Sequence, residues 1–579
     1  MVGSETHVEA VHVAREPGRS PLVANLAALA FFVGLSLAFF GPKILPHLHD
    51  RVFTGRPGDW GFFVWALEWW PHAIGHGLNP LFTHDLWHPS GINLAWTTVA
   101  PTPSVMLAPI TSLFGPVAAF DVASLLAPAA AAWTAFLLFS RLTRRAFAPS
   151  LAGGFVFGFS PYLMAQLVSG HLNLSLVLMV PICTYLVVCR LQDSLSPRRF
   201  VALMSVCLVV QFGISTEVFA TMAAFGFAVG AIGWFVAPVR ERPRVLAVGG
   251  WLVLSYAAAL VVVSPYLYAM FAYPEPYKPL FSHPLGPILV GDLPRLLVPG
   301  KTEILGLNFG QPGTDLWYFH LERYGWYVPL PLLAITVHLW MTQRRRPAVK
   351  VAVVAFVCGL VLAIGPSIKV GTTHLPLPWT LVQALPLIGR ALPYRMMAYA
   401  ALALGACVAY WLASAPRSWR RWSVFALGGF LLLPNIGTDL WTREVTVPPF
   451  FTTGQYRQFL SPGEVVWIVD LDGGRQMLWQ TDAQMYFRLS GGYTGVTPPG
   501  LADPGTEYSL VSGHIRPQDA AAIKAFVTTH DVGAVIVGDE PPAAVTELSR
   551  DLGVDPVRTG GVVFYRLHIG LHIGLNTGS

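Results

Sequence analysis

Residues 22–45, LVANLAALAFFVGLSLAFFGPKIL, form an apolar run near the start of the chain. About 20 apolar residues in a helix cross the hydrocarbon core of a bilayer, so this run is long enough to span it. Polar residues 1–20 precede the run and no small-residue cleavage site follows it, which favours a retained anchor over a removed signal peptide. We therefore expect a cytoplasmic N-terminus over residues 1–21, followed directly by a first membrane span.

The composition places the whole chain in the membrane-protein class. Of its 579 residues 54% are apolar and only 12% are charged, and the mean hydropathy is +0.54. So little charge cannot cover a soluble surface, which favours burial in a bilayer. The net charge of +6 sits in short arginine clusters rather than in a continuous basic stripe, so nucleic-acid binding is disfavoured. The five cysteines lie in apolar runs without a CxxC spacing, which predicts neither disulfides nor a metal cluster.

Eleven apolar segments are candidate membrane spans. They are residues 22–45, 117–140, 147–167, 173–190, 199–215, 217–237, 245–269, 326–342, 348–365, 391–414 and 422–438. With this count all six arginine clusters fall on one side of the membrane, which the positive-inside rule makes the cytoplasmic side. Residues 101–114 must then lie on the membrane surface or dip into it without crossing.

The opposite face carries two long loops, about residues 46–100 and 270–325, and everything after about residue 440. The part after residue 440 alternates predicted strands with predicted helices, as in a small α/β domain. The predicted strands are residues 464–471, 532–538 and 561–567, and the predicted helices are residues 519–531 and 542–553. The predicted fold class is therefore a polytopic α-helical membrane protein, residues 22–439, with a small extracytoplasmic α/β domain, residues 440–567, and a tail, residues 568–579.

The first outer loop is the part of the chain richest in aromatic and titratable side chains. It reads GDWGFFVWALEWWPHAI at residues 58–74 and GLNPLFTHDLWHPSGINL at residues 77–94. Tryptophan favours the interface between membrane and water, so we expect this loop to lie on the bilayer. A helix is predicted from Trp60 to Trp70, with Pro71 as its stop. Asp59 directly precedes that helix and is either its N-cap or a general base at the bilayer surface, two roles that are compatible.

This order of parts resembles the C-type fold (GT-C) glycosyltransferases, integral-membrane enzymes that take a sugar from a polyprenyl-phosphate carrier. The chain shares with them a short cytoplasmic N-terminus, one span, a long outer loop with an acid near its start, further spans, a second long outer loop and an outer soluble domain. The two stretches of the first loop look like those of bacterial lipid-linked-sugar transferases. A second acid next to Asp59, present in some relatives, is absent here.

The resemblance implies inverting transfer of the sugar to an envelope glycan, lipid or protein acceptor at the outer face of a bacterial plasma membrane. Asp59 would be the general base. The partners implied are the polyprenyl-phosphate donor, the acceptor and membrane lipids. No cofactor is implied, and a divalent metal is left open.

A departing phosphate needs cations, and the two-pronged guanidinium of arginine suits it best. Arg395 lies about one turn inside the outer end of a predicted span, where a charge is usually functional or paired. Arg390 and Arg323 are further candidates for binding the donor phosphate, as is Lys278, although solvated charge is common in loops. The candidates for substrate binding are Glu68, His84, Asp85, His88, His171 and Glu217.

Several of these residues have a second interpretation. A histidine such as His171 is more often satisfied at a helix end than functional, and Glu217 lies in a short turn between two spans, where an acid is more often functional or salt-bridged than idle. The trio of His84, Asp85 and His88 suits either ordinary polar turns or a metal site. We expect no metal there, because the HPSG sequence at residues 88–91 is typical of a turn.

Two other functions stay open. The chain lacks GxxxxGK[ST], GxSxG and HExxH, which disfavours ATP-driven transport and the commonest hydrolase chemistries. A transporter or flippase for a lipid-linked sugar would place ionisable residues near the bilayer midplane and often shows an internal repeat. Here Glu217 and Arg395 lie near the rim and no repeat is found, which favours the enzyme. A non-catalytic envelope-assembly protein would keep the tryptophans without needing Asp59.

Overall fold

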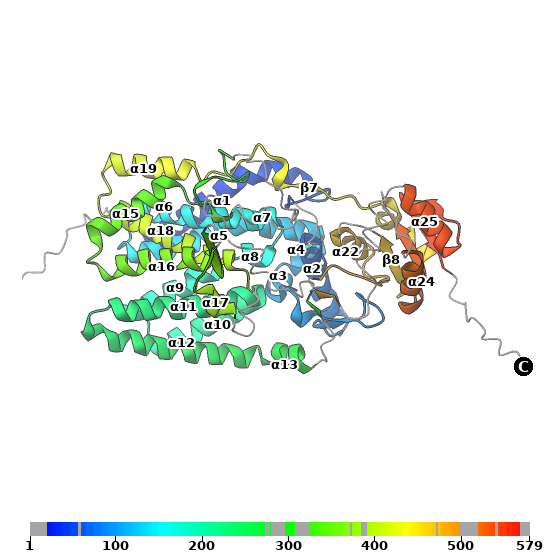
Figure 1. Ribbon diagram of the computed structural model, residues 1–579, viewed down its shortest axis with the longest axis horizontal. Coiled ribbons are helices and arrows are strands. Elements are labelled where there is room, and N and C mark those ends of the chain that lie inside the picture. Colours follow the sequence, from blue (N-terminus) through cyan, green and yellow to red (C-terminus); the bar gives the residue numbers. More distant parts are fainter. Residues whose placement is uncertain are drawn as a thin grey trace, which may run out of the picture.

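The computed structural model describes residues 20–55, 59–272, 278–279, 296–306, 325–370, 373–383, 391–469, 473–494, 496–497, 519–538 and 542–567. The molecule is elongated: a bundle of long helices occupies one end and a small sheet occupies the other (Figure 1). The first outer loop lies between them, around helix α2 (Asp59–Gly75).

Nine helical stretches in the described part of the chain are long and apolar enough to cross a membrane. They are Pro21–His47, Pro116–Leu142, Phe147–Val168, Leu172–Leu191, Pro197–Ile214, Thr216–Val236, Val239–Val262, Pro347–Ile364 and Pro393–Ala413. Each coincides with a predicted span. The other two predicted spans contain shorter helices, α15 (Leu330–Gln343) and α19 (Trp419–Phe430). The protein is therefore a polytopic α-helical membrane protein, with nine of the eleven predicted spans at full spanning length.

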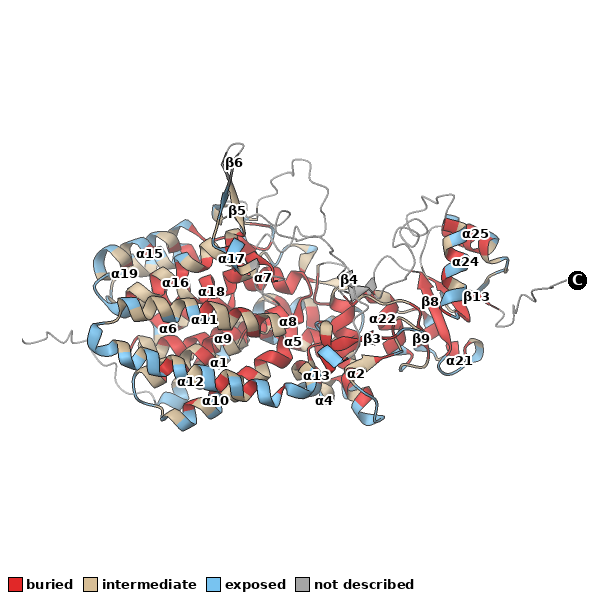
Figure 2. Cartoon of the chain, turned by 60° about the horizontal axis from the view of Figure 1, so that its bottom comes forward, coloured by how far each residue is buried: buried red, intermediate tan, exposed pale blue. Residues whose placement is uncertain are grey.

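Three spans form the centre of the bundle. Of the residues in the apolar stretch of each span, 72% are buried in Pro116–Leu142 and 89% in both Phe147–Val168 and Pro393–Ala413. In Val239–Val262, at the periphery, 17% are buried. Figure 2 shows this buried centre. Small residues allow the close packing: a Cβ atom on Gly153 would lie 2.6 Å from the carbonyl oxygen of Gly405.

The central span Phe147–Val168 is interrupted, and the interruption shapes the outer face. It consists of α6 (Phe147–Gly158) and α7 (Pro161–Val168). Ser160 caps α7 through its hydroxyl, which accepts a hydrogen bond from the Leu163 N–H at 3.4 Å. Proline is favoured directly after such a cap because its fixed φ suits the first helical turn. The eight-residue α7 is thus a separate short helix at the outer end of the bundle.

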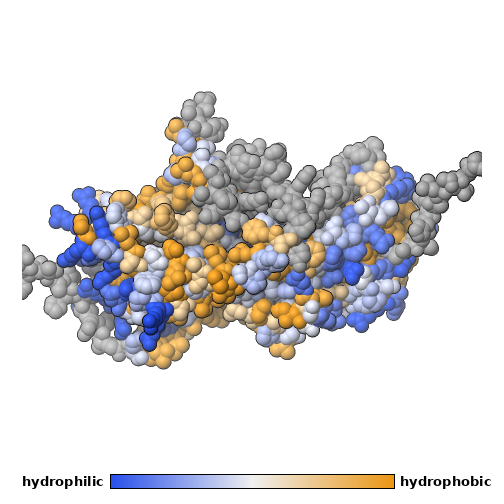
Figure 3. Space-filling view, turned by 90° about the horizontal axis from the view of Figure 1, so that it is seen from below, coloured by the Kyte–Doolittle hydropathy of each residue, from blue (hydrophilic) through white to orange (hydrophobic). Residues whose placement is uncertain are grey.

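The two ends of the bundle differ in polarity. The turns that follow α9 (Met179–Leu191), α15 and α18 (Met397–Ala413) carry the predicted arginine clusters. Figure 3 shows hydrophilic residues gathered at that end, a largely hydrophobic middle, and further hydrophilic residues at the opposite end of the molecule. Residues 101–114 form α3 (Pro101–Met106) and α4 (Ala108–Phe114), each too short to cross a bilayer, in agreement with the prediction of a non-crossing segment.

The C-terminal region contains a five-stranded sheet of order β12-β13-β11-β8-β9. Its strands are β8 (Val465–Val469), β9 (Arg488–Leu489), β11 (Ala534–Val537), β12 (Val557–Thr559) and β13 (Val562–Arg566). β8 pairs in parallel with β11 and β9, and β13 runs antiparallel to its neighbours. The helices α24 (Asp519–Thr529) and α25 (Pro542–Leu552) lie where helices are predicted. One further helix, α22 (Gly473–Asp482), packs against α2.

Candidate functional site

Helix α2 carries the predicted base. It begins at Asp59, which places this acid in the first turn, where the helix dipole stabilises a negative charge. The helix does not stop at Pro71 as predicted but continues to Gly75. Trp70 and Ala73 are both buried, so packing on the two sides of the proline keeps the chain helical despite the lost hydrogen bond.

The carboxylate of Asp59 meets the imidazole of His171. Oδ2 of Asp59 lies 2.6 Å from Nε2 of His171, and the side chains are 39% and 7% exposed, respectively. The turn before His171 requires glycine: Gly170 has a φ of +71°, and a Cβ there would lie 3.0 Å from both Thr54 and Trp60. This turn brings a buried ring against a partly exposed carboxylate, two candidates that the sequence places far apart.

Hydrogen bonds fix the start of the first outer loop. The Phe53 N–H donates to the Asp121 carboxylate at 2.7 Å, the Gly55 N–H donates to the Val168 carbonyl at 2.8 Å, and the Thr54 hydroxyl donates to the same carbonyl at 3.1 Å. Asp121 belongs to α5 (Pro116–Leu142) and is fully buried. Sequence analysis did not single it out, although a lone acid inside an apolar run is a recognised signal of function or pairing.

Arg395 and Glu217 form an ion pair at the rim of the bundle. Arg395 lies in η7 (Pro393–Met396) and Glu217 in the first turn of α11 (Thr216–Val236). Their side chains are 18% and 20% exposed, and the Arg395 Nε–H also donates to the Tyr394 hydroxyl at 3.1 Å. The pair is neutral overall, so the arginine is held at the membrane rim without an uncompensated charge.

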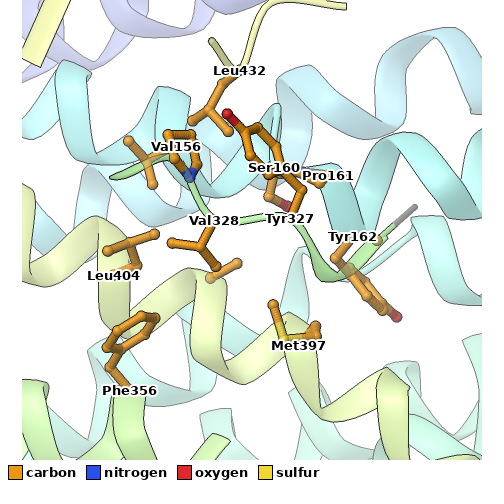
Figure 4. Close-up of a pocket in the computed structure, with 13 residues that line it drawn as sticks. Val156, Ser160, Pro161, Tyr162, Tyr327, Val328, Phe356, Met397, Leu404 and Leu432 are labelled. Atoms are coloured by element: carbon orange, nitrogen blue, oxygen red, sulfur yellow. The ribbon is translucent and has the colours of Figure 1, made fainter. Parts of the chain in front are cut away.

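His171 follows the C-terminal end of α7. Met397, two residues after Arg395, lines a cavity together with Pro161 at the N-terminal end of that helix (Figure 4). The cavity is lined mostly by apolar side chains, and neither Asp59 nor Arg395 is among them.

Glu68 faces the C-terminal region rather than the Asp59–His171 pair. Burial raises the pKa of Glu68. Asp482, at the end of α22, has its pKa raised to about 6 by burial and by the neighbouring charge of Glu68. His72 stacks on Trp69 and His76, with ring centroids 6.0 and 4.2 Å apart.

The predicted trio of the first loop borders the sheet. Burial raises the pKa of Asp85 against the opposing effect of Arg488, whose Nε lies 3.6 Å from the Asp85 carboxylate. Burial and the charge of Arg488 lower the pKa of the His88 imidazole. The backbone N–H of His88 donates to the Leu489 carbonyl at 3.1 Å. Nδ1 of His84 lies 3.0 Å from the Pro89 carbonyl oxygen. Among the described residues these three do not gather as a metal-binding group.

Three further residues are candidates for binding the donor phosphate. Arg390 and Arg323 lie outside the described residues. Lys278 belongs to the short strand β4 (Lys278–Pro279), whose backbone pairs with β10 (Val496–Thr497) of the C-terminal region. The second outer loop thus contacts the same region as the first.

Comparison with known proteins extends these observations. No family model matches the chain, and no curated protein sequence matches it. The arabinofuranosyltransferase AftD from Mycobacteria matches in structure with a TM-score of 0.60 and 16% identity, over 96% of this chain and 42% of that chain. The archaeal oligosaccharyltransferase AglB from Archaeoglobus fulgidus, in complex with an inhibitory peptide and a dolichol-phosphate, matches with a TM-score of 0.50 and 11% identity, over 95% of this chain and 75% of that chain.

ArnT from Cupriavidus metallidurans, bound to undecaprenyl phosphate, gives a TM-score of 0.49 and 13% identity over 94% of this chain and 97% of that chain. The chain spans less than half the length of the AftD chain that it matches. At these identities the likeness is one of fold, and it rests on AftD and AglB. Over almost its whole length, the chain has the GT-C fold of membrane glycosyltransferases.

Proposed function

We propose that this protein transfers a sugar from a polyprenyl-phosphate donor to an envelope glycan, lipid or protein acceptor at the outer face of a bacterial plasma membrane. The observation that carries the proposal is the Asp59–His171 pair: a partly exposed carboxylate in the first turn of α2, oriented by a buried imidazole. The GT-C fold supports it, as does AglB, a transferase whose solved complex contains dolichol-phosphate.

The chemistry follows from the position of this carboxylate. The oxygen of an acceptor hydroxyl attacks the anomeric carbon and forms the new glycosidic bond, while the bond from that carbon to the phosphate oxygen breaks. The hydroxyl proton passes to Asp59, and polyprenyl phosphate departs with the bonding electron pair. Attack from the face opposite the leaving group inverts the anomeric configuration. General-base catalysis of this kind contributes about 10²- to 10⁴-fold to a rate.

Arg395 is the proposed cation for the leaving phosphate. Its ion pair with Glu217 and its hydrogen bond to Tyr394 hold the guanidinium at the membrane rim, where the phosphate of a lipid carrier lies. The proposal needs no cofactor. The arginine clusters at the far end of the bundle support, by the positive-inside rule, an extracytoplasmic α/β region.

The test is transfer by purified protein from radiolabelled polyprenyl-phosphate sugars. Asp59→Asn is expected to lose about 10²- to 10⁴-fold in kcat while keeping its thermal unfolding profile in detergent. Asp50→Asn is the matched control, because Asp50 lies in the same loop and pairs with His47 at the surface, 3.1 Å away. Unaltered transfer by Asp59→Asn would remove Asp59 as the base. Failure of the wild type with every carrier would favour the transporter or the assembly protein.

A further inference from the structure

A third side chain, that of Gln166, contacts the imidazole of the Asp59–His171 pair. Nδ1 of His171 lies 2.8 Å from Oε1 of Gln166, and the backbone N–H of His171 donates to the Gln166 carbonyl at 3.0 Å. Gln166 belongs to α7 and its side chain is fully buried. Backbone and side chain of one residue therefore fix both the position and the rotation of the imidazole.

Each ring nitrogen of His171 faces an oxygen. Nε2 faces the carboxylate of Asp59 and Nδ1 faces the side-chain amide of Gln166. The Asp59 carboxylate only accepts hydrogen bonds, so the His171 ring donates to it from Nε2. The contact between Nδ1 and the Gln166 amide holds the other side of the ring, and the ring in turn fixes the orientation of the Asp59 carboxylate through a short, charge-assisted hydrogen bond.

We propose that His171 and Gln166 are positioning residues for Asp59, acting as a linear series in which Gln166 orients His171 and His171 orients the base. The inference rests on the proposed function, because it assigns these residues to the same transfer reaction. Neither side chain is placed to bind substrate itself, since His171 is 6% exposed and Gln166 is fully buried. Their effect reaches the reacting atoms only through Asp59.

The backbone turn at Gly170, directly before His171, packs tightly against the start of α2. A Cβ atom on Gly170 would lie 3.0 Å from the Thr54 hydroxyl, 3.0 Å from the Trp60 Cβ and 3.3 Å from the Trp60 backbone nitrogen. The turn that carries His171 is thus wedged against the first turn of α2. An orienting group so placed raises kcat by keeping the base in a reactive geometry, without contributing to donor affinity.

The experiment compares His171→Ala and Gln166→Leu with the wild type in transfer assays and in separate binding assays with undecaprenyl phosphate. Both variants are expected to lose 10- to 100-fold in kcat, with Kd for undecaprenyl phosphate changed by less than twofold. Added imidazole is expected to restore part of the activity of His171→Ala. Gln166→Asn, which keeps an amide, is expected to retain more activity than Gln166→Leu.

His530→Ala is the control. It removes a similarly buried imidazole, 5% exposed, whose Nδ1 lies 2.9 Å from the Phe526 carbonyl oxygen in the α/β region. If Asp59→Asn is inactive but His171→Ala and Gln166→Leu keep wild-type kcat, the inference is wrong and the proposed function stands. Loss of kcat together with donor affinity, with no recovery in imidazole, also overturns it, because a merely structural role gives that result. Wild-type kcat in Asp59→Asn instead removes Asp59 as the base and these positioning roles with it, whereas absence of transfer by the wild type overturns the proposed function.

Discussion

A Cβ atom on Gly61 of α2 would lie 2.0 Å from the Cα of Gly474 in α22. The two helices therefore meet backbone to backbone, and Gly474 itself rests on the ring of Trp60, where a Cβ would come within 2.9 Å. Asp59 is two residues from this contact. The C-terminal region thus braces the turn that carries the proposed base.

Substitution at this contact tests the bracing. Gly61→Ala forces α2 and α22 apart, and overpacking of this kind costs about 1 to 3 kcal/mol. We expect a lower unfolding temperature in detergent and a reduced kcat, because the first turn of α2 shifts. Gly75→Ala, at the other end of α2, is the control, since a Cβ there meets nothing within 4 Å. Equal behaviour of the two variants would contradict the prediction.

Gln480 makes three hydrogen bonds, two of which join the C-terminal region to the first outer loop. Its Oε1 accepts from the Trp65 indole at 2.8 Å, and its Nε2 donates to the carbonyls of Asp85 and Phe487, both at 2.9 Å. Gln480→Leu leaves the Trp65 indole N–H without this acceptor, and an unpaired buried polar group costs about 1 to 3 kcal/mol. We expect faster proteolytic release of the C-terminal region. Exposed Gln458→Leu should change nothing, and an unaltered digestion rate in Gln480→Leu would count against the contact.

The spans and the α/β elements were predictable because they depend on local patterns. An apolar run of spanning length predicts a helix wherever it packs, and the alternation after residue 440 predicts strands such as β8 and β11. The two short helices α15 and α19 show the limit of that rule. Their ends are set by turns and by neighbours, and apolar length alone does not locate them.

The site was predictable only in part, because its contacts join distant segments. Asp59 stands out from its place before an aromatic helix, and Glu217 and Arg395 from charge at the rim. That His171 faces Asp59 depends on the turn at Gly170 packing against α2, which no periodicity encodes. Gln166 carries no charge, so nothing in its sequence context separates it from other polar residues in apolar helices.

Glu303 predicts a dependence of stability on pH. It is buried, accepts hydrogen bonds from the Gly300 N–H at 2.7 Å and the Thr302 hydroxyl at 2.8 Å, and burial raises its pKa from 4.5 to about 8. Between those values the folded protein keeps a proton that the unfolded chain releases. The contribution to stability is therefore complete below pH 4.5, falls as pH rises, and is lost above pH 8, a change on the order of a few kcal/mol.

Glu303→Gln should remove this slope, because the amide does not titrate. The measurement is the unfolding temperature in detergent from pH 5 to pH 9, with Glu444→Gln as the control. The Glu444 side chain is 76% exposed and pairs with Arg51 at the surface. The prediction is wrong if the difference in unfolding temperature between the wild type and Glu303→Gln is the same at pH 9 as at pH 5, because Glu303 then does not titrate between those pH values.

The Arg395–Glu217 pair separates a structural role from donor binding. Arg395→Met or Glu217→Gln alone leaves a partly buried charge without the opposite charge of this pair, whereas the double variant is neutral again. We expect a coupling of about 1 to 3 kcal/mol in unfolding free energy, with stability recovered in the double variant. The exposed pair Arg51 and Glu444 should couple by less than about 1 kcal/mol.

Donor affinity should not recover in the double variant. Both Arg395→Met and the double variant should bind undecaprenyl phosphate at least about tenfold more weakly, since a lost charged contact costs about 1.4 kcal/mol or more. Wild-type affinity in the double variant would mean that Arg395 holds the helices together and another cation receives the phosphate.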